Sequence, residues 1–213
     1  MLDKKLKLNN MNYTISTETI GDYKLELVPD DNPINPREDD NLCKILSLHK
    51  NYSGDKHNYK TYDYDNLEEL IAAIKKGEDA CVIVPLYFYE HGGIIVRTSP
   101  FNDRFDSGAF GFAVVSKQAI RKTYNLKRVS AKSIQLARGI IEIEVEMYSQ
   151  YINGDIYGFK VIDKDGCMLE DGYGYYNSED CLIDGRSFIN RLIETNSYNA
   201  TLEQDNIRYE SNK

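Results

Sequence analysis

The strongest strand signal in the sequence is the stretch ACVIVPLYFYEHGGIIVRT, residues 80–98. The run from Cys81 to Tyr89 is almost continuously apolar, which is typical of a strand that is covered on both faces. Because proline cannot donate a ladder hydrogen bond, Pro85 predicts an edge position or a bulge. Residues 91–93 predict a turn, and residues 94–96 predict the second strand of a hairpin.

Further strands and helices are predicted on both sides of this hairpin. Alternating or β-branched runs predict strands at residues 13–15, 23–28, 42–48, 109–115, 157–162 and 168–176. Capping residues followed by helical patterns predict helices at residues 67–76 after Asp65 or Asn66, at residues 117–124 after Ser116, and at about 178–194 after Asn177 or Ser178.

Residues 130–152 fit two patterns. Glutamates alternate with apolar residues between Ile141 and Met147, as in a strand. Apolar residues also recur every three or four positions from Ile134 to Ile152, which indicates one face of a helix. The length of the pattern and Ser130 as an N-cap favour the helix.

Together these elements predict an α+β fold with a largely antiparallel mixed sheet and about three helices. A single domain is expected over residues 13–196, because no linker or internal repeat divides the chain. Residues 1–12 are expected to form a flexible N-terminal segment, and residues 197–213 a polar C-terminal tail.

Composition excludes several classes of protein. The chain has 213 residues, with 26 Lys and Arg against 34 Asp and Glu, so its formal net charge is −8. No apolar run approaches the roughly 20 residues that a membrane-spanning helix needs. The first ten residues contain no apolar core of a secretory signal, and the four cysteines form no CxxC pair. We therefore expect a cytoplasmic protein with no membrane partner.

The familiar catalytic motifs for phosphate binding, zinc proteases and serine hydrolases are absent, which argues against an enzyme without excluding one. One alternative is a metal-dependent hydrolase with zinc or manganese bound by imidazoles and a carboxylate. Its candidate ligands are His49, Asp55, His57 and His91. Their spacing matches no compact ligand pair. We therefore favour the interpretation that the histidines are exposed or hydrogen-bonded within the fold, and we expect no cofactor.

An acidic loop offers a candidate binding site. Its carboxylates are Asp30, Asp31, Glu38, Asp39 and Asp40, and Arg37 is its one basic residue. Prolines 29, 33 and 36 stiffen the segment. Such a loop can bind a hard cation, present phosphate-like charge to a basic partner, or remain solvated with Arg37 paired internally.

The basic stretch, residues 117–138, contains seven Lys and Arg residues and no acidic one. It is a candidate for binding RNA or phosphate, but Tyr124 is its only aromatic residue, so no base-stacking surface is predicted. We expect its side chains to pair with acidic segments of the same chain, and direct nucleic-acid binding through it is a weaker alternative.

The loop at residues 99–108 follows the central hairpin and carries Asp103 and Asp106. These carboxylates are expected to face the turn at His91 across the end of the sheet. Because loops at sheet ends commonly carry sites, a pocket is expected there.

Five ordered blocks resemble a family of small acidic proteins encoded by phages and conjugative plasmids. The blocks are residues 35–42, 49–57, 85–93, 98–112 and 148–159, and the resemblance covers about residues 22–185. It implies an accessory protein of a mobile element, of the kind encoded near anti-CRISPR and antirestriction genes. It implies no enzymatic activity and assigns no functional residue. The expected partner is a host defence protein or nucleoprotein complex, which the protein inhibits through the acidic loop.

Overall fold

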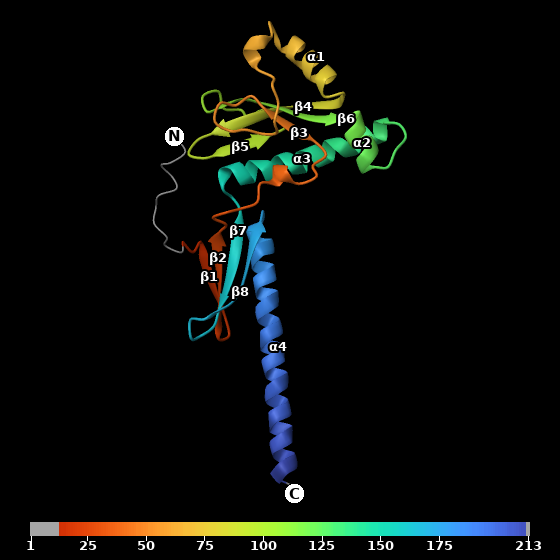
Figure 1. Ribbon diagram of the computed structural model, residues 1–213. Coiled ribbons are helices and arrows are strands. Elements are labelled where there is room, and N and C mark those ends of the chain that lie inside the picture. The colour runs from red at the N-terminus through yellow and green to blue at the C-terminus, as the bar shows by residue number, and fades with distance from the viewer. Residues whose placement is uncertain (1–12, 212–213) are drawn as a thin grey trace. The chain divides into compact units, whose positions relative to one another are not determined.

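The computed structural model describes the backbone of residues 13–211 and the side chains of residues 13–204 (Figure 1). Within this range the chain forms eight strands and four α-helices, which confirms the α+β class. All strand pairs are antiparallel, and they form two four-stranded sheets rather than one. The segment at residues 1–12, expected to be flexible, lies outside the described residues.

The chain divides into two compact units, whereas the sequence predicts one domain. The inserted unit is Ile34–Asp155, and the terminal unit combines Met1–Pro33 with Ile156–Lys213. Each unit contains one of the two sheets. No helix among the described residues has both the length and the apolar character needed to cross a membrane.

The inserted unit contains a sheet in the order β3-β6-β4-β5. Its elements are η1 (Pro36–Glu38), β3 (Lys44–Ser47), η2 (Thr61–Asp63), α1 (Leu67–Gly77), β4 (Ala80–Glu90), β5 (Ile94–Arg97), β6 (Ser107–Ser116), α2 (Lys117–Thr123) and α3 (Ala131–Asn153). The predicted hairpin is confirmed as β4 and β5. Strand β5 pairs only with Tyr87–Glu90 of β4, so Pro85 lies where β4 has β6 on one side and no strand on the other.

Helices α3 and α1 pack on opposite faces of this sheet. Ile45 and Ala113 belong to the core that contains Ile141 of α3. Their sequence neighbours Leu46 and Val114 belong to a second cluster, formed with Leu70 and Ile74 of α1. Because successive strand residues point to opposite faces, the two clusters are separated by the sheet itself. Such a doubly covered sheet explains the nearly continuous apolar run in β4.

The ambiguous region is a helix, and its caps are local. The Ser130 hydroxyl accepts a hydrogen bond from the Ser133 N–H at 3.2 Å, and the Ser133 hydroxyl accepts one from the Ser130 N–H at 2.9 Å. This reciprocal pair is a capping box. At the other end, Gly154 adopts a left-handed conformation with φ of 81°, which ends α3 without the steric cost of a side chain.

The terminal unit contains a sheet in the order β1-β2-β7-β8, and α4 packs on it. Its elements are β1 (Ser16–Ile20), β2 (Tyr23–Pro29), β7 (Tyr157–Ile162), β8 (Met168–Tyr175) and α4 (Ser178–Ser211). Gly185 allows a close approach of α4 to the sheet, because a Cβ there would collide with Leu25. The strand predicted at 13–15 instead begins at Ser16, and the last helix continues past 194 through most of the expected polar tail.

Candidate functional site

The structure does not bring the candidate metal ligands together. His49 packs among Tyr52, Phe88 and Phe110, and its side chain is only 6% exposed. Its Nδ1 accepts a hydrogen bond from the Asn51 N–H at 3.3 Å, which requires a neutral ring. Burial lowers the pKa of His49, and the nearby Glu90 carboxylate only partly opposes that shift. His49 is therefore an aromatic member of the inserted unit's packing.

The other two histidines have separate partners. His57 Nε2 lies 2.8 Å from the Ser47 carbonyl oxygen, and its Nδ1 accepts a hydrogen bond from the Tyr59 N–H. His91 is largely exposed, and its Nδ1 lies 2.9 Å from Asp106 Oδ2. The expected proximity of Asp106 to the His91 turn is therefore confirmed. Within residues 13–204, no group of three His, Cys, Asp or Glu side chains is placed to hold a metal ion.

Arg37 stands at the centre of a polar network in the inserted unit. Its side chain is 5% exposed, and its Nη2 lies 2.7 Å from Asp55 Oδ2. Its other donors reach the side-chain oxygen of Asn41 at 2.8 Å and the carbonyl of Cys43. Burial by itself would lower the pKa of Arg37, but the hydrogen bond and charge of Asp55, with the charge of Glu144, raise it overall. The guanidinium is therefore a permanently charged, internally paired group.

Two carboxylates complete this network by binding backbone donors. Glu144 of α3 accepts hydrogen bonds from the N–H groups of Leu42 and Cys43 at 2.7 and 2.9 Å. Asp55 accepts one from the Ile45 N–H at 2.6 Å. Since charge-assisted hydrogen bonds are short and strong, they fix the segment after η1 against α3. Asp55, a candidate metal ligand in the sequence, is instead the partner of Arg37.

The five candidate carboxylates fall into two groups. Asp30 and Asp31 belong to the terminal unit, where Asp30 Oδ2 accepts a hydrogen bond from the Gly174 N–H at 3.1 Å. The others belong to the inserted unit, where they form an exposed acidic turn, Glu38–Asp40, directly after Arg37. The five carboxylates are thus divided between the two units, and the acidic turn is the part held by the Arg37 network.

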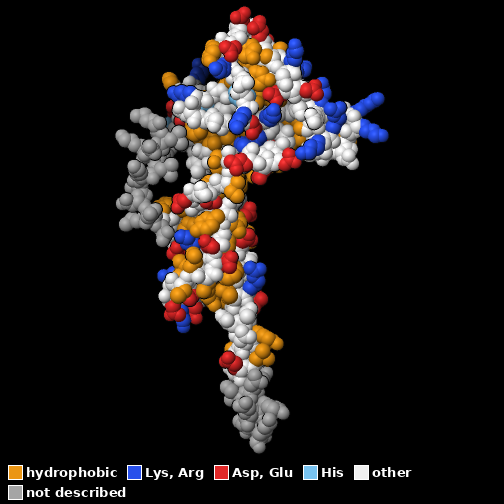
Figure 2. All heavy atoms as spheres, viewed as in Figure 1, with side chains coloured by type: hydrophobic (Ala, Val, Ile, Leu, Met, Phe, Trp, Pro, Cys, Tyr) orange, Lys and Arg blue, Asp and Glu red, His pale blue; other side chains and the backbone are white. Residues whose placement is uncertain are grey.

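The basic stretch is paired internally at two positions. Lys117 Nζ lies 2.8 Å from Asp79, and Lys122 Nζ lies 3.2 Å from Asp40 of the acidic turn. Both pairs are largely exposed, and such pairs contribute about 0–1 kcal/mol each. Figure 2 shows further basic side chains gathered over α2 and the connection to α3. Among the residues that the structure describes, internal pairing thus accounts for Lys117 and Lys122.

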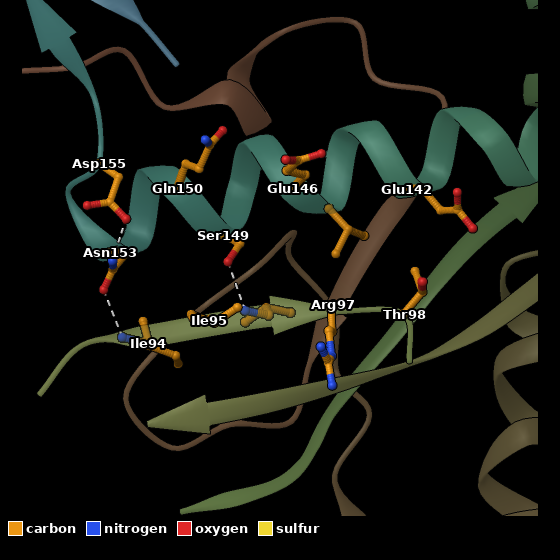
Figure 3. A pocket seen from close by; sticks show the side chains of 12 residues that line it. Ile94, Ile95, Arg97, Thr98, Glu142, Glu146, Ser149, Gln150, Asn153 and Asp155 are labelled. Atoms are coloured by element: carbon orange, nitrogen blue, oxygen red, sulfur yellow. Dashed lines mark hydrogen bonds between the residues drawn. The ribbon is translucent and has the colours of Figure 1, made fainter. Parts of the chain in front are cut away.

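A groove of about 480 Å³ lies between β5 and α3 (Figure 3). Ser149 of α3 accepts a hydrogen bond from the Val96 N–H, and Asn153 accepts one from the Ile94 N–H, both at 2.8 Å. Strand β5 is the edge of its sheet, so these side chains satisfy donors that another strand would otherwise bind. Because both N–H groups are already bound by side chains of α3, another strand cannot pair with β5 through them.

Sequence reasoning anticipated that Arg37 is paired internally, but it missed Glu144 as a member of the same network. Arg37 was visible as the only base in an acidic segment, and that contrast is the available signal for its role. Glu144 gave no such signal. In the sequence it is one of three glutamates that alternate with apolar residues, and the other two, Glu142 and Glu146, are exposed in the structure. Comparison of the chain with family models, curated proteins and solved structures gives no match.

Proposed function

We propose that this protein is an accessory protein of a phage or mobile element that binds and inhibits a host defence protein, of the anti-CRISPR or antirestriction type. The acidic turn meets Lys and Arg side chains of the partner and takes the place of nucleic-acid phosphates. The host-defence part of the proposal is supported by the resemblance of the five sequence blocks. The binding part is supported by the geometry of the acidic turn.

One observation carries the binding part. Arg37 is buried and fully engaged, while the three carboxylates that follow it, Glu38–Asp40, are exposed. A rigid segment loses little conformational entropy when it docks, so its charges are presented in a fixed arrangement before the partner arrives. Electrostatic complementarity of this kind mainly raises the association rate and sets the register of the complex.

The experiment is affinity capture from the bacterial host followed by mass spectrometry. Wild type is compared with a variant of the acidic turn, Asp39→Asn with Asp40→Asn, which removes two charges and keeps the shape. A matched control, Glu194→Gln with Glu203→Gln, removes two exposed charges from α4. We expect a stoichiometric defence protein with wild type and control, and much less of it with the turn variant. Equal capture by all three proteins contradicts the proposal.

A further inference from the structure

Helix α3 carries a second apolar face besides the one that packs into the core. Its members are Leu136, Ile140, Ile143 and Met147, called here the α3 stripe. Steps of four, three and four residues place them along one side of a helix. Leu136 is 50% exposed and Ile143 is 59% exposed, while the other two are half-buried. Ile140 also packs against the core of the inserted unit, so the part of the stripe that folding leaves uncovered is formed mainly by Leu136 and Ile143.

Carboxylates follow one long edge of the α3 stripe. Glu142 and Glu146 are exposed and stand one turn apart on the same helix. Figure 3 shows both of them on the part of α3 that passes β5. At 100° per residue they lie about 60–100° around the helix from Ile143. One side of the stripe is therefore acidic over its C-terminal half.

The acidic turn borders the other long edge. Glu144 stands one turn from both Ile140 and Met147, and it holds the N–H groups of Leu42 and Cys43. Leu42 follows the acidic turn after a single residue, Asn41, so the end of the turn comes close to this edge of the stripe. The α3 stripe thus has carboxylates along both of its long edges.

We propose that the α3 stripe, with its two acidic edges, binds one amphipathic basic helix of the partner protein. Apolar side chains of that helix cover Leu136 and Ile143, and its Lys or Arg side chains meet the carboxylates on both sides. Helix recognition by an apolar stripe uses anchors spaced three or four residues apart, which is the spacing found here. The inference rests on the proposed function and gives the partner's binding element a definite form.

The charge pattern argues for a basic partner rather than a second copy of this chain. Two copies that pair through the same surface would bring like-charged edges together, which opposes association. Lys132 and Arg138 stand in the N-terminal half of α3, so the acidic edges dominate over its C-terminal half. The basic side chains of the partner helix are therefore expected over that half.

The test uses full-length protein and a synthetic peptide of about 20 residues of Leu and Lys, arranged so that a helix has one apolar face. A scrambled peptide of the same composition keeps the charge and loses the apolar face. Fluorescence anisotropy is expected to show roughly tenfold tighter binding of the amphipathic peptide than of the scrambled one. Leu136→Gln with Ile143→Gln is expected to abolish that advantage. Ile183→Gln with Ile193→Gln, which changes two exposed apolar residues of α4, is expected to keep it.

A second pair of substitutions keeps the test decisive if the stripe variant is unstable. Glu142→Gln with Glu146→Gln is expected to weaken binding of the amphipathic peptide several-fold at low salt. Equal affinity for both peptides, or unchanged binding by both variants, overturns the helix proposal. It is also overturned if wild type is a dimer and Leu136→Gln with Ile143→Gln makes it a monomer. If Asp39→Asn with Asp40→Asn still reduces capture of the defence protein in that case, the proposed function stands without the helix.

Discussion

Arg37 anchors the acidic turn to the rest of the inserted unit through the side chain of Asp55 and the backbone of Cys43. The position of Arg37 matters because the carboxylates of the acidic turn repel one another. Its positive charge offsets part of that repulsion. Its burial also commits Asp55 and Glu144 to the same small volume. Removing Arg37 leaves both carboxylates without a counter-charge.

We expect Arg37→Met to destabilise the protein by about 3–5 kcal/mol, the usual cost of breaking a buried ion pair. Arg37→Lys is expected to recover part of this loss, because an ammonium keeps the charge but cannot bind all the acceptors at once. Urea unfolding of the three proteins measures both effects. A loss below about 1 kcal/mol for Arg37→Met would show that the network does not hold the turn.

His49 is expected to make the protein less stable as the pH falls. Burial lowers its pKa in the folded state, whereas the unfolded chain has the ordinary value of about 6.5. Below that value the unfolded state binds more protons, so the free energy of unfolding rises with pH from the lowered folded-state pKa up to about 6.5.

The measurement is the free energy of unfolding of wild type and His49→Asn between about pH 5 and pH 7.5, a range that brackets the ordinary histidine pKa. The wild-type curve is expected to be the steeper one below about pH 6.5. His91 and His57 are present in both proteins, so their contributions largely cancel. Parallel curves would mean that His49 is not held neutral by its packing.

At the level of the elements, sequence reasoning succeeded where the cause was local. Asn66 caps α1 and Ser116 caps α2, each through a side-chain hydrogen bond to an N–H three residues later. Such bonds depend only on neighbouring residues, so the sequence alone is enough to predict where these helices begin. Glu144 is different, because its partners lie about a hundred residues away and no spacing rule connects them.

The division of strands between two sheets could not be predicted for a similar reason. An alternating pattern identifies a strand such as β2, but it does not say which strand lies beside it. Strand β2 pairs with β7, so more than a hundred residues separate Pro29 from its partner Tyr157. The sequence therefore predicted the class and most of the elements correctly, and it merged two sheets into one.

Strand β5 provides a test at this scale. Ser149→Ala with Asn153→Ala removes the acceptors that serve Val96 and Ile94 on the sheet edge. Each unpaired buried donor is expected to cost about 1–3 kcal/mol. The freed edge is also expected to pair with another molecule, so analytical ultracentrifugation should show self-association that wild type lacks.

The control for this variant is Gln135→Ala with Gln118→Ala, which shortens two exposed amides of the same unit. It is expected to remain as stable as wild type within about 0.5 kcal/mol. A stable, monomeric Ser149→Ala with Asn153→Ala protein would show that these side chains do not protect β5.

At the scale of the whole molecule, each apolar core belongs to one unit. The two clusters of the inserted unit contain only residues between 42 and 152, and the cluster of the terminal unit contains only residues between 20 and 33 or after 156. The Asp30 N–H donates to the Ile156 carbonyl at 2.8 Å, so the segments of the terminal unit that flank the insertion lie side by side. Each unit thus has what independent folding requires.

We expect a chain of residues 34–155 to fold cooperatively by itself. Residues 13–33 joined to 156–211 by a short Gly/Ser linker are expected to fold as well. Circular dichroism and urea titration of each chain provide the check. If residues 34–155 remain unfolded while the full chain is folded, the protein is one cooperative domain, as the sequence predicts.

The central claim is that the acidic turn docks on a basic partner surface. Its most direct test is the association rate constant for the captured defence protein, measured over a range of salt concentrations. Asp39→Asn with Asp40→Asn is expected to slow association several-fold at low salt and to flatten its salt dependence, with stability changed by less than about 0.5 kcal/mol. Glu194→Gln with Glu203→Gln is expected to behave as wild type. Identical rates and identical salt dependence for the turn variant and wild type would contradict the claim.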